Sequence, residues 1–381
     1  MKQITDVVII GGGIIGCAVA YQLRKQGVDV VVVDKGEIGG EASSAATGLL
    51  APIRPFLKPQ NSYLPLQLAS LALFPSLVPE LESVSGIAIE FERTGTLRVV
   101  QARQETRLRA WMQDWQQRGF PIELLTGNEL HRQEPALASH IATAIYNPDE
   151  PQLNAAQLMN AYACAVANLG TILLTHTEVT GILRRGKRVT GISTPQGEIA
   201  CGHLVIAAGA WSAICGNWLD LAIPVQPLRG QSLALFQPAS PVQHIIFGER
   251  VYLAPKPDGS IFVGATRDNV GFDCSTTVEG ITWLRDAVMR LAPGIDTGSI
   301  KRAWAGLRPQ TPDTWPILGS APGWENVFLA CGHGGFGILL SAITGQVAAE
   351  AIITGQSPLL IQPFGLQRFA TQSQQDTIHA A

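Results

Sequence analysis

The chain has 381 residues, of which 46% are hydrophobic and 15% are charged, and its formal net charge is −3. This length predicts two domains, or one large domain with a second built into it, and the apolar share is enough to bury a large core. A slightly acidic chain gives no electrostatic reason to expect nucleic acid as a partner.

Cysteine usage and the N-terminus bear on location and on metals. The six cysteines form no C-x-x-C pair and accompany no His cluster at ligand spacing. This pattern predicts a reduced, cytoplasmic protein without a metal site. The first residues lack the features of a signal peptide, and no uninterrupted apolar run is long enough to predict a membrane span.

The first 34 residues carry the strongest local pattern. Residues 7–10 are a continuous apolar run, which is typical of a strand buried on both faces. Gly11, Gly13 and Gly16 complete G-x-G-x-x-G and open a helix that we expect to end near Lys25. Such glycines allow a tight turn, close approach of a pyrophosphate and close packing of helix on strand. The segment therefore predicts a dinucleotide site at a helix N-terminus.

A second predicted strand, "VDVVVVD", ends at Asp34. A carboxylate at this position accepts a hydrogen bond from a ribose 2′-OH and repels a 2′-phosphate. FAD or NAD is therefore favoured over NADP, and the motif alone does not separate the two.

Two segments follow before residue 80. "GGEASSAATGLLAP", residues 39–52, is rich in small residues that leave room for a cofactor, and Ser43 and Ser44 could donate to its phosphate or ribitol oxygens. An ordinary small-residue loop explains the same pattern equally well. Residues 64–79 are the most apolar long stretch, and their prolines favour a buried helix over a membrane contact.

Later segments return to the nucleotide site. "HTEVTGI", residues 176–182, is predicted as a strand, and the charged residues 184–188 as the solvated tip of a hairpin around Gly186. "HLVIAAGAWS", residues 203–212, is predicted as a buried strand. "VFLACGHGGFGILLSAITGQVAAEAI", residues 327–352, is predicted as a strand, a glycine turn and a helix from Ile338, whose N-terminus would be a further anion site.

"VYLAPKPDGSIFVGATR", residues 251–267, is predicted as a hairpin with a four-residue loop. That loop pairs Tyr252 with Val263 and places Tyr252, Val263, Ala265 and Arg267 on one face of the sheet. Tyr252 is either a core tyrosine or a ligand-binding one. Arg267 is either a solvent or ion-pair residue or part of a pocket.

"GLRPQTPD", residues 306–313, places Arg308 among apolar residues. A guanidinium keeps its charge and needs an anionic partner when it is buried. Two partners stay open, namely Asp313 or another carboxylate of the chain, and the carboxylate of a substrate. His333, between glycines, is interpreted as a turn residue or a cofactor neighbour in preference to a general base.

Five of these segments, taken in order, resemble the D-amino acid oxidase family of FAD enzymes, especially its glycine oxidase and sarcosine oxidase branch. They are "VVIIGGGIIG", "ASSAATGLLAP", "VIAAGAWS", "GLRPQTPD" and "GHGGFGILLS", and they run from about residue 7 to residue 341. The resemblance implies an α/β fold with a Rossmann-like FAD-binding domain at 1–80, 146–225 and 319–381. It also implies an α+β substrate domain with a mostly antiparallel sheet at 81–145 and 226–318.

The resemblance also implies roles for individual residues. Arg308 and the Tyr252 hydroxyl would bind the substrate carboxylate, with Arg267 as a further catalytic candidate, and Asp34 and the backbone near Val179 would contact the adenine part of FAD. The predicted cofactor contacts are Gly11, Gly13, Ile14, Ile15, Gly16, Asp34, Lys35, Ser43, Ser44, Thr47, Gly48, Leu49, Val179, Ala208, Gly209, Trp211, Arg308, His333, Gly334, Gly335, Phe336, Gly337 and Ile338.

The sequence departs from the family pattern at three positions. Gly306 stands where sarcosine oxidases carry the cysteine that tethers the flavin, which implies noncovalent FAD. The second arginine that follows the "GH" of glycine oxidase is absent from "GHGGFG". Arg267 stands where glycine oxidase has an apolar pocket residue, so it could replace the missing charge or bind a side-chain carboxylate.

The implied reaction is oxidation of a small 2-amino acid such as glycine, sarcosine or a D-amino acid. A hydride passes to flavin N5, and the products are an imino acid, then a 2-oxo acid, with hydrogen peroxide from dioxygen. The alternatives are a dehydrogenase that passes electrons to a quinone or a partner subunit, an FAD enzyme acting on tRNA, and a non-catalytic flavoprotein subunit. The oligomeric state stays open, a homo-oligomer included, and so does whether the product feeds thiazole synthesis for thiamine.

Overall fold

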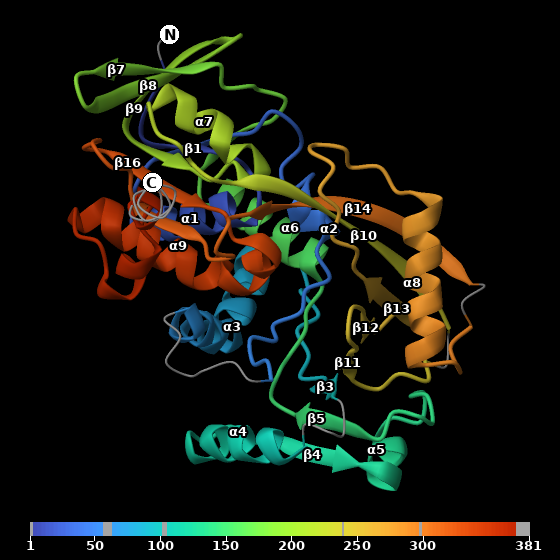
Figure 1. Cartoon of the computed structure of the whole chain (residues 1–381). Helices are drawn as coiled ribbons and strands as arrows, with labels where there is room; N and C mark the ends of the chain where they lie inside the picture. Colours follow the sequence, from blue (N-terminus) through green and yellow to red (C-terminus); the bar gives the residue numbers. More distant parts are fainter. Residues whose placement is uncertain (1–2, 56–62, 101–104, 238–239, 297–298, 371–381) are drawn as a thin grey trace, which may run out of the picture.

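The computed structural model describes residues 3–55, 63–100, 105–237, 240–296 and 299–370, and these residues form two eight-stranded sheets (Figure 1). One sheet is largely parallel and carries helices on both faces. The other is antiparallel except for one parallel pair. The predicted fold class, a Rossmann-like domain joined to a mostly antiparallel α+β domain, is confirmed.

The first sheet has the strand order β15-β16-β9-β1-β2-β6, with β7 and β8 extending from β9. Its strands are β1 (Gln3–Ile10), β2 (Val30–Val33), β6 (Ile172–Leu174), β7 (Gly181–Arg185), β8 (Arg188–Thr194), β9 (Gly197–Ile206), β15 (Ile317–Ser320) and β16 (Val327–Cys331). Alternate residues serve opposite faces: Val7 and Ile9 belong to the core under the helices, and Val8 and Ile10 to the core on the other side. Burial on both faces explains the continuous apolar runs.

Helices α1 (Ile14–Lys25) and α9 (Gly337–Thr354) pack on one face of this sheet, and α3 (Tyr63–Ser85) and α6 (Ala155–Asn168) pack against these two helices (Figure 1). The helix predicted at 64–79 is therefore confirmed, and Pro75 and Pro79 lie inside it. Helix α9 crosses α1 closely at Gly345, where an added Cβ would lie 2.6 Å from the Ala18 carbonyl oxygen. A glycine in mid-helix is needed for this contact.

Two helical segments, Tyr63–Ser85 and Gly334–Thr354, are long and apolar enough to cross a bilayer by length and composition alone. The prediction that no apolar run is long enough to span a membrane is therefore corrected as far as length and composition are concerned. Residues of both helices belong to the core cluster that packs on the first sheet. That burial accounts for their apolar composition.

The second sheet has the order β14-β10-β13-β12-β11-β3-β5-β4. Its strands are β3 (Thr96–Val99), β4 (Glu123–Thr126), β5 (Thr143–Asn147), β10 (Gln226–Phe236), β11 (Ile245–Phe247), β12 (Tyr252–Pro255), β13 (Ser260–Gly264) and β14 (Ile300–Gln310). Helix α8 (Val278–Leu291) packs on one face, where Leu233, Leu253 and Val263 are fully buried. The remaining α-helices of the described residues are α2 (Ala42–Ala45), α4 (Glu105–Gln117), α5 (Gly127–Gln133) and α7 (Ser212–Trp218).

Two local predictions are wrong. Tyr252 pairs with Gly264, and Val263 pairs with Leu253, so the hairpin register is shifted by one residue from the predicted one. The turn is longer by one residue because the Lys256 N–H donates to the Ser260 carbonyl. Residues 175–180 form no strand, and β7 begins only at Gly181.

Other local predictions agree with the structure. The charged residues 184–188 do form a hairpin tip, where Arg185 pairs with Arg188 across Gly186. The proposed domain limits stay a prediction, and the limit between 145 and 146 falls inside β5.

Candidate functional site

The glycines that follow β1 allow three backbone segments to meet. An added Cβ on Gly11 would lie 2.3 Å from the Ala207 carbonyl oxygen, and one on Gly16 would lie 1.9 Å from the Gly11 carbonyl oxygen. Side chains at these positions would separate α1 from the carboxyl ends of β1 and β9. The N-terminus of α1 therefore opens at the edge of the parallel sheet, where ligands of such folds bind.

Polar side chains hold this turn in place. The Ser43 hydroxyl accepts from the Ile14 N–H at 2.9 Å. The Asp34 carboxylate accepts from the Gly12 N–H at 2.7 Å and from the Gly36 N–H at 2.8 Å. Asp34 thus braces the loop with both oxygens, and its contact with a ribose stays a prediction.

A cavity of about 1140 Å³ runs from the N-terminus of α1 to the N-terminus of α9 and the open face of the second sheet. Neither helix has an acidic residue in its first turn, so both positive dipole ends are available to an anion. The predicted residues that line the cavity are Gly13, Ile14, Ile15, Ser43, Thr47, Gly48, Leu49, Gly209, Tyr252, Arg267, Arg308, His333, Gly334, Gly335, Phe336, Gly337 and Ile338.

Eight predicted residues do not line this cavity, namely Gly11, Gly16, Asp34, Lys35, Ser44, Val179, Ala208 and Trp211. The Lys35 ammonium lies 3.6 Å from the centre of the Trp211 ring, so these two residues contact each other. The Ser44 hydroxyl donates to the Gly39 carbonyl. The Val179 side chain is buried in the core of the first sheet, which leaves only its backbone for a ligand.

His333 is buried at the turn before α9, and its Nε2 lies 3.1 Å from the Thr344 hydroxyl. Burial lowers the pKa of His333 to about 3. The imidazole is therefore neutral near pH 7, which agrees with a turn residue that borders the cavity and not with a proton-accepting group poised near neutrality.

Arg308 lies on the cavity face of the second sheet. Its guanidinium covers Gly230 on β10, where an added Cβ would lie 2.2 Å from Nη1, and it donates to the Thr266 carbonyl at 3.1 Å. Burial, reinforced by the charge of Arg267, lowers its pKa from the ordinary value, although Tyr252 and Asp268 act in the opposite direction. A guanidinium remains protonated all the same.

The two partners that the sequence left open for Arg308 can now be compared. Asp313 pairs with Arg368, whose Nε lies 2.7 Å from Oδ2. Burial raises the pKa of Asp313, but the hydrogen bonds from Arg368 and the Trp315 N–H and the charge of Arg368 together hold it below its usual value. Among the described residues, no carboxylate forms an ion pair with Arg308. A partly buried cation that pairs with no acid in the described part of the chain is suited to bind an anionic ligand.

Tyr252 lies on the same face of the sheet as Arg308. Strand pairing aligns Tyr252 with Gly264, Gly264 with Ser232 and Arg308 with Leu228, so alternation places both side chains on the face opposite α8. The Tyr252 hydroxyl lies 2.5 Å from the Thr47 hydroxyl. An added Cβ on Gly264 would lie 2.3 Å from that hydroxyl, so a glycine here leaves room for the ring.

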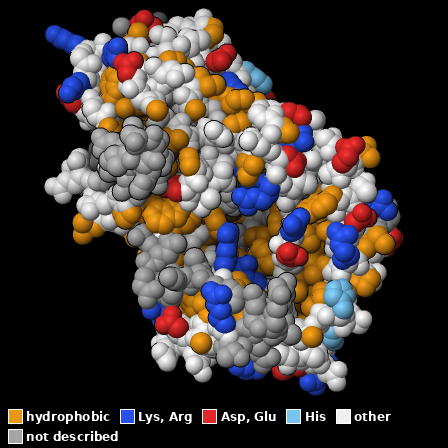
Figure 2. Space-filling view, in the orientation of Figure 1, with side chains coloured by type: hydrophobic (Ala, Val, Ile, Leu, Met, Phe, Trp, Pro, Cys, Tyr) orange, Lys and Arg blue, Asp and Glu red, His pale blue; other side chains and the backbone are white. Residues whose placement is uncertain are grey.

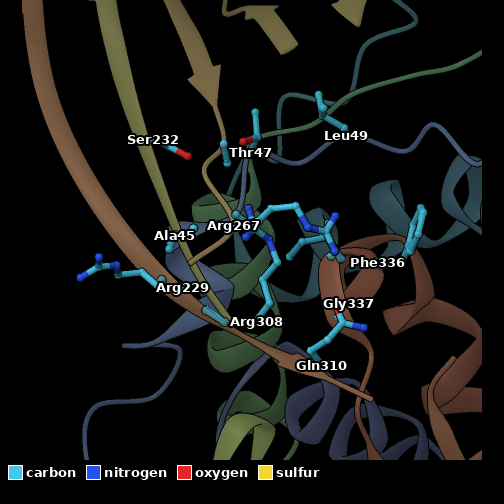
Figure 3. Close-up of a pocket in the computed structure, with 18 of the residues that line it drawn as sticks. Ala45, Thr47, Leu49, Arg229, Ser232, Arg267, Arg308, Gln310, Phe336 and Gly337 are labelled. Carbon is cyan, nitrogen blue, oxygen red and sulfur yellow. The ribbon is translucent and has the colours of Figure 1, made fainter. Parts of the chain in front are cut away.

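Arg267 follows β13 on a loop that runs beside Arg308 (Figure 3). The Arg229 side chain holds this loop in place. It is 5% exposed and points away from the cavity in Figure 3. Arg229 pairs with Asp268 at 3.3 Å and with Asp273 at 2.7 Å. These two ion pairs hold the loop that carries Arg267 and the Thr266 carbonyl.

Sequence reasoning missed Arg54, which also lines the cavity and whose guanidinium carbon lies 4.6 Å from the centre of the Phe336 ring. It stands in "APIRPF", an arginine among apolar residues and prolines, so the signal that identified Arg308 could have identified it as well. Within the described ranges, no group of His, Cys, Asp and Glu could hold a metal ion.

Comparison with known proteins gives a family and close relatives. The family model described as "FAD dependent oxidoreductase" (DAO) matches residues 6–351. The chain is 34% identical to glycine oxidase of Geobacillus kaustophilus, covering 95% of this chain and 97% of that protein. It is 32% identical to the hydrogen cyanide synthase subunit HcnC of Pseudomonas aeruginosa, covering 97% of each. The crystal structure of the Geobacillus kaustophilus glycine oxidase superposes with a TM-score of 0.91 at 33% identity, covering 96% of this chain and 99% of that one.

Proposed function

The chain belongs to the family of FAD-dependent oxidoreductases, and we propose that it oxidises a small 2-amino acid whose carboxylate is bound by Arg308 and Tyr252. Membership and relatives establish an FAD-dependent amino acid oxidoreductase. The single observation that carries the assignment of the carboxylate site is the Arg308 guanidinium, which lies in the cavity without an acidic partner among the described residues.

The residues present fit FAD. The cavity of about 1140 Å³ exceeds the volume of roughly 300–1,000 Å³ that is usual for small-molecule sites, so it has room for a dinucleotide and a small substrate together. Gly13 lines it at one end, where a phosphate can approach the N-terminus of α1. We propose that the FAD is held noncovalently, because Gly306 stands at the tether position and burial raises the pKa of the lining thiol Cys331 to about 12.

The chain's own part in the reaction is orientation and electrostatics. Bound FAD would supply the acceptor for a hydride leaving the substrate Cα. Arg308 and the Tyr252 hydroxyl would hold the carboxylate and thereby fix the orientation of Cα. The N-terminus of α9 would stabilise negative charge at the adjoining end of the cavity. No protein base is required if the amine arrives neutral, which agrees with the neutral state of His333.

Two candidate functions differ in the electron acceptor that reoxidises the flavin. We propose an oxidase that uses dioxygen and yields hydrogen peroxide and an imino acid, which hydrolyses to a 2-oxo acid. A dehydrogenase that passes electrons to a partner is the second candidate, because a relative that matches over nearly its full length is a subunit of hydrogen cyanide synthase. A cytoplasmic location is proposed from the six free cysteines.

One experiment tests the reaction and the acceptor together. The holoenzyme is mixed anaerobically with glycine, sarcosine and a panel of D- and L-amino acids while the flavin absorbance is followed. Bleaching by an amino acid supports the proposed reaction, and a spectrum unchanged by all of them contradicts it. Repeating the active reaction under air with peroxide detection, and with a dye in place of oxygen, separates oxidase from dehydrogenase.

A further inference from the structure

We propose that the substrate is a dicarboxylic amino acid, whose second carboxylate is bound by Arg267 and Arg54. This inference rests on the proposed function, since it takes the first carboxylate to be bound by Arg308 and Tyr252. It names the substrate class that the charges of the cavity select.

Three arginines converge on the substrate end of the cavity. Arg308, Arg267 and Arg54 come from β14, from the loop after β13 and from the segment before α3, and all three line the same cavity. Figure 2 shows Lys and Arg side chains gathered around the hollow on this face of the molecule, and Figure 3 shows Arg267 and Arg308 in one pocket. The segments are far apart in sequence, so the fold alone brings their charges together.

The neighbouring acidic side chains are engaged elsewhere. Asp268 accepts from Gln231 at 3.0 Å and Thr266 at 2.7 Å and pairs with Arg229. Glu150 pairs with Arg98 at 3.3 Å and accepts from the Ile53 N–H at 2.9 Å.

Two further acids, Glu249 and Glu279, line the cavity together with Arg250. All three are exposed, as Arg267 and Arg54 also are, and no described ion pair joins either acid to Arg308, Arg267 or Arg54. Asp268 and Glu150 therefore act on Arg308 and Arg54 only through longer-range attraction, and no described carboxylate forms an ion pair with any of the three arginines.

The charge of Arg267 acts on both of the other two arginines. Burial is the main cause that lowers the pKa of Arg308 and of Arg54, and the positive charge of Arg267 acts on both in the same direction. At Arg54 the charge of Arg98 acts in that direction more strongly than Arg267 does. Like charges repel along the wall of the cavity, although water screens the exposed Arg267 and Arg54 more than the partly buried Arg308. Glycine brings one carboxylate, which can neutralise Arg308 and leaves the repulsion between Arg267 and Arg54 in place.

A second carboxylate on the substrate removes that repulsion. A guanidinium presents paired N–H donors that match the two oxygens of a carboxylate, and such charged bonds are stronger than neutral ones. Arg54 is held in position by stacking on Phe336, and Arg267 is held by the braced loop after β13. The second carboxylate could stand on the carbon side chain or on the amine substituent, and both kinds of compound share the chemistry that this pair recognises.

The substrate panel gives the first test. The holoenzyme is reduced anaerobically with glycine, sarcosine, both enantiomers of alanine, aspartate and glutamate, and N-(carboxymethyl)glycine. We expect at least one dicarboxylic compound to exceed glycine in kcat/KM by about tenfold or more, as one charged hydrogen bond supplies. A clear preference for glycine, sarcosine or alanine would overturn the inference and leave the proposed function standing. No reduction by any compound would overturn both.

Matched variants give the second test. In Arg267→Met and Arg54→Gln we expect the ratio of kcat/KM for the dicarboxylic substrate to that for glycine to fall about tenfold or more. The control is Arg302→Gln, an exposed arginine on β14 that does not line the cavity, and it should keep the wild-type ratio. Ratios unchanged in both pocket variants would overturn the inference.

A binding measurement keeps the inference testable if one variant fails to fold. Dissociation constants of the unreactive ligands acetate, malonate and succinate are read from the flavin absorbance of the oxidised holoenzyme. We expect a dicarboxylate to bind wild-type enzyme about tenfold or more tightly than acetate, and to lose that advantage in whichever variant folds. Equal binding of acetate and both dicarboxylates to wild-type enzyme would refute the second carboxylate site.

Discussion

Replacing Arg308 by alanine should strongly weaken substrate binding while leaving the fold intact, and the structure gives the reason for both. In the described part of the chain, the guanidinium donates one hydrogen bond, to the Thr266 carbonyl, and pairs with no acid. Removing it therefore breaks no ion pair. The lost hydrogen bond costs about 0.5–1.5 kcal/mol, and the relief of a partly buried unpaired charge acts in the opposite direction.

The expected loss of activity is much larger. Truncating one member of a buried, hydrogen-bonded charge pair costs about 2–5 kcal/mol, part of it because the substrate carboxylate is left unpaired in a partly buried site. At 1.4 kcal/mol for each factor of ten, kcat/KM should fall by about 30-fold to about 4000-fold. Arg308→Lys should recover only part of the loss, because an ammonium lacks the two-pronged donor geometry.

The assay compares three variants under the same conditions. Anaerobic flavin reduction gives kcat/KM, the released flavin gives the cofactor content, and thermal unfolding gives Tm. Arg302→Ala, on the same strand but outside the cavity lining, is the matched control. If Arg308→Ala kept its flavin and its wild-type kcat/KM on every active amino acid, the carboxylate role would be wrong. If its Tm fell steeply instead, Arg308 would be a structural residue.

Three further predictions follow from particular contacts. Gly230→Ala would place a Cβ 2.2 Å from the flexible end of Arg308, so we expect the guanidinium to move. As a result kcat/KM should fall about tenfold or more while the FAD content stays unchanged. Unchanged kinetics would contradict the observed packing. Tyr252→Phe should lower kcat/KM by about tenfold to about 100-fold, the value of one hydrogen bond to a charged carboxylate, and a loss larger than that of Arg308→Ala would contradict a secondary role. The pKa of His333 is about 3 in the fold and near 6.5 when exposed, so the unfolded chain binds the extra proton between these values and stability falls as pH drops from 6.5. Between pH 6.5 and 4 the wild type should lose about 3 kcal/mol more unfolding free energy than His333→Gln, measured by denaturant titration, and parallel pH curves would refute the buried neutral state.

The βαβ unit at the N-terminus was predictable because its determinants are local. The apolar run of β1, the spacing of Gly11, Gly13 and Gly16, and the acid that ends β2 all lie within 34 residues, and the structure forms each element there. The same holds for β16, the glycine turn and α9. In each case the hydrophobic periodicity and the turn residues involve neighbours in the sequence, so the pattern can be recognised without the tertiary structure.

The hairpin that carries Tyr252 shows where local reasoning fails. A loop longer by one residue shifts the pairing and exchanges the two faces of the partner strand. Val263 consequently packs under α8, and Gly264 lies opposite Tyr252. The sequence of the turn permits either register, and the burial of Leu253 and Val263 in one core selects between them.

The partner of each arginine was decided by the tertiary structure. Asp313, five residues from Arg308, pairs instead with Arg368, which is 55 residues further along the chain. Arg54 and Arg267 reach the same cavity as Arg308 from separate segments. The sequence by itself determined that a dinucleotide site follows the first strand and that Arg308 needs an anion. Only the fold decided that no neighbouring acid among the described residues meets that need, because charges separated by tens or hundreds of residues interact only once packing has brought them within a few ångströms.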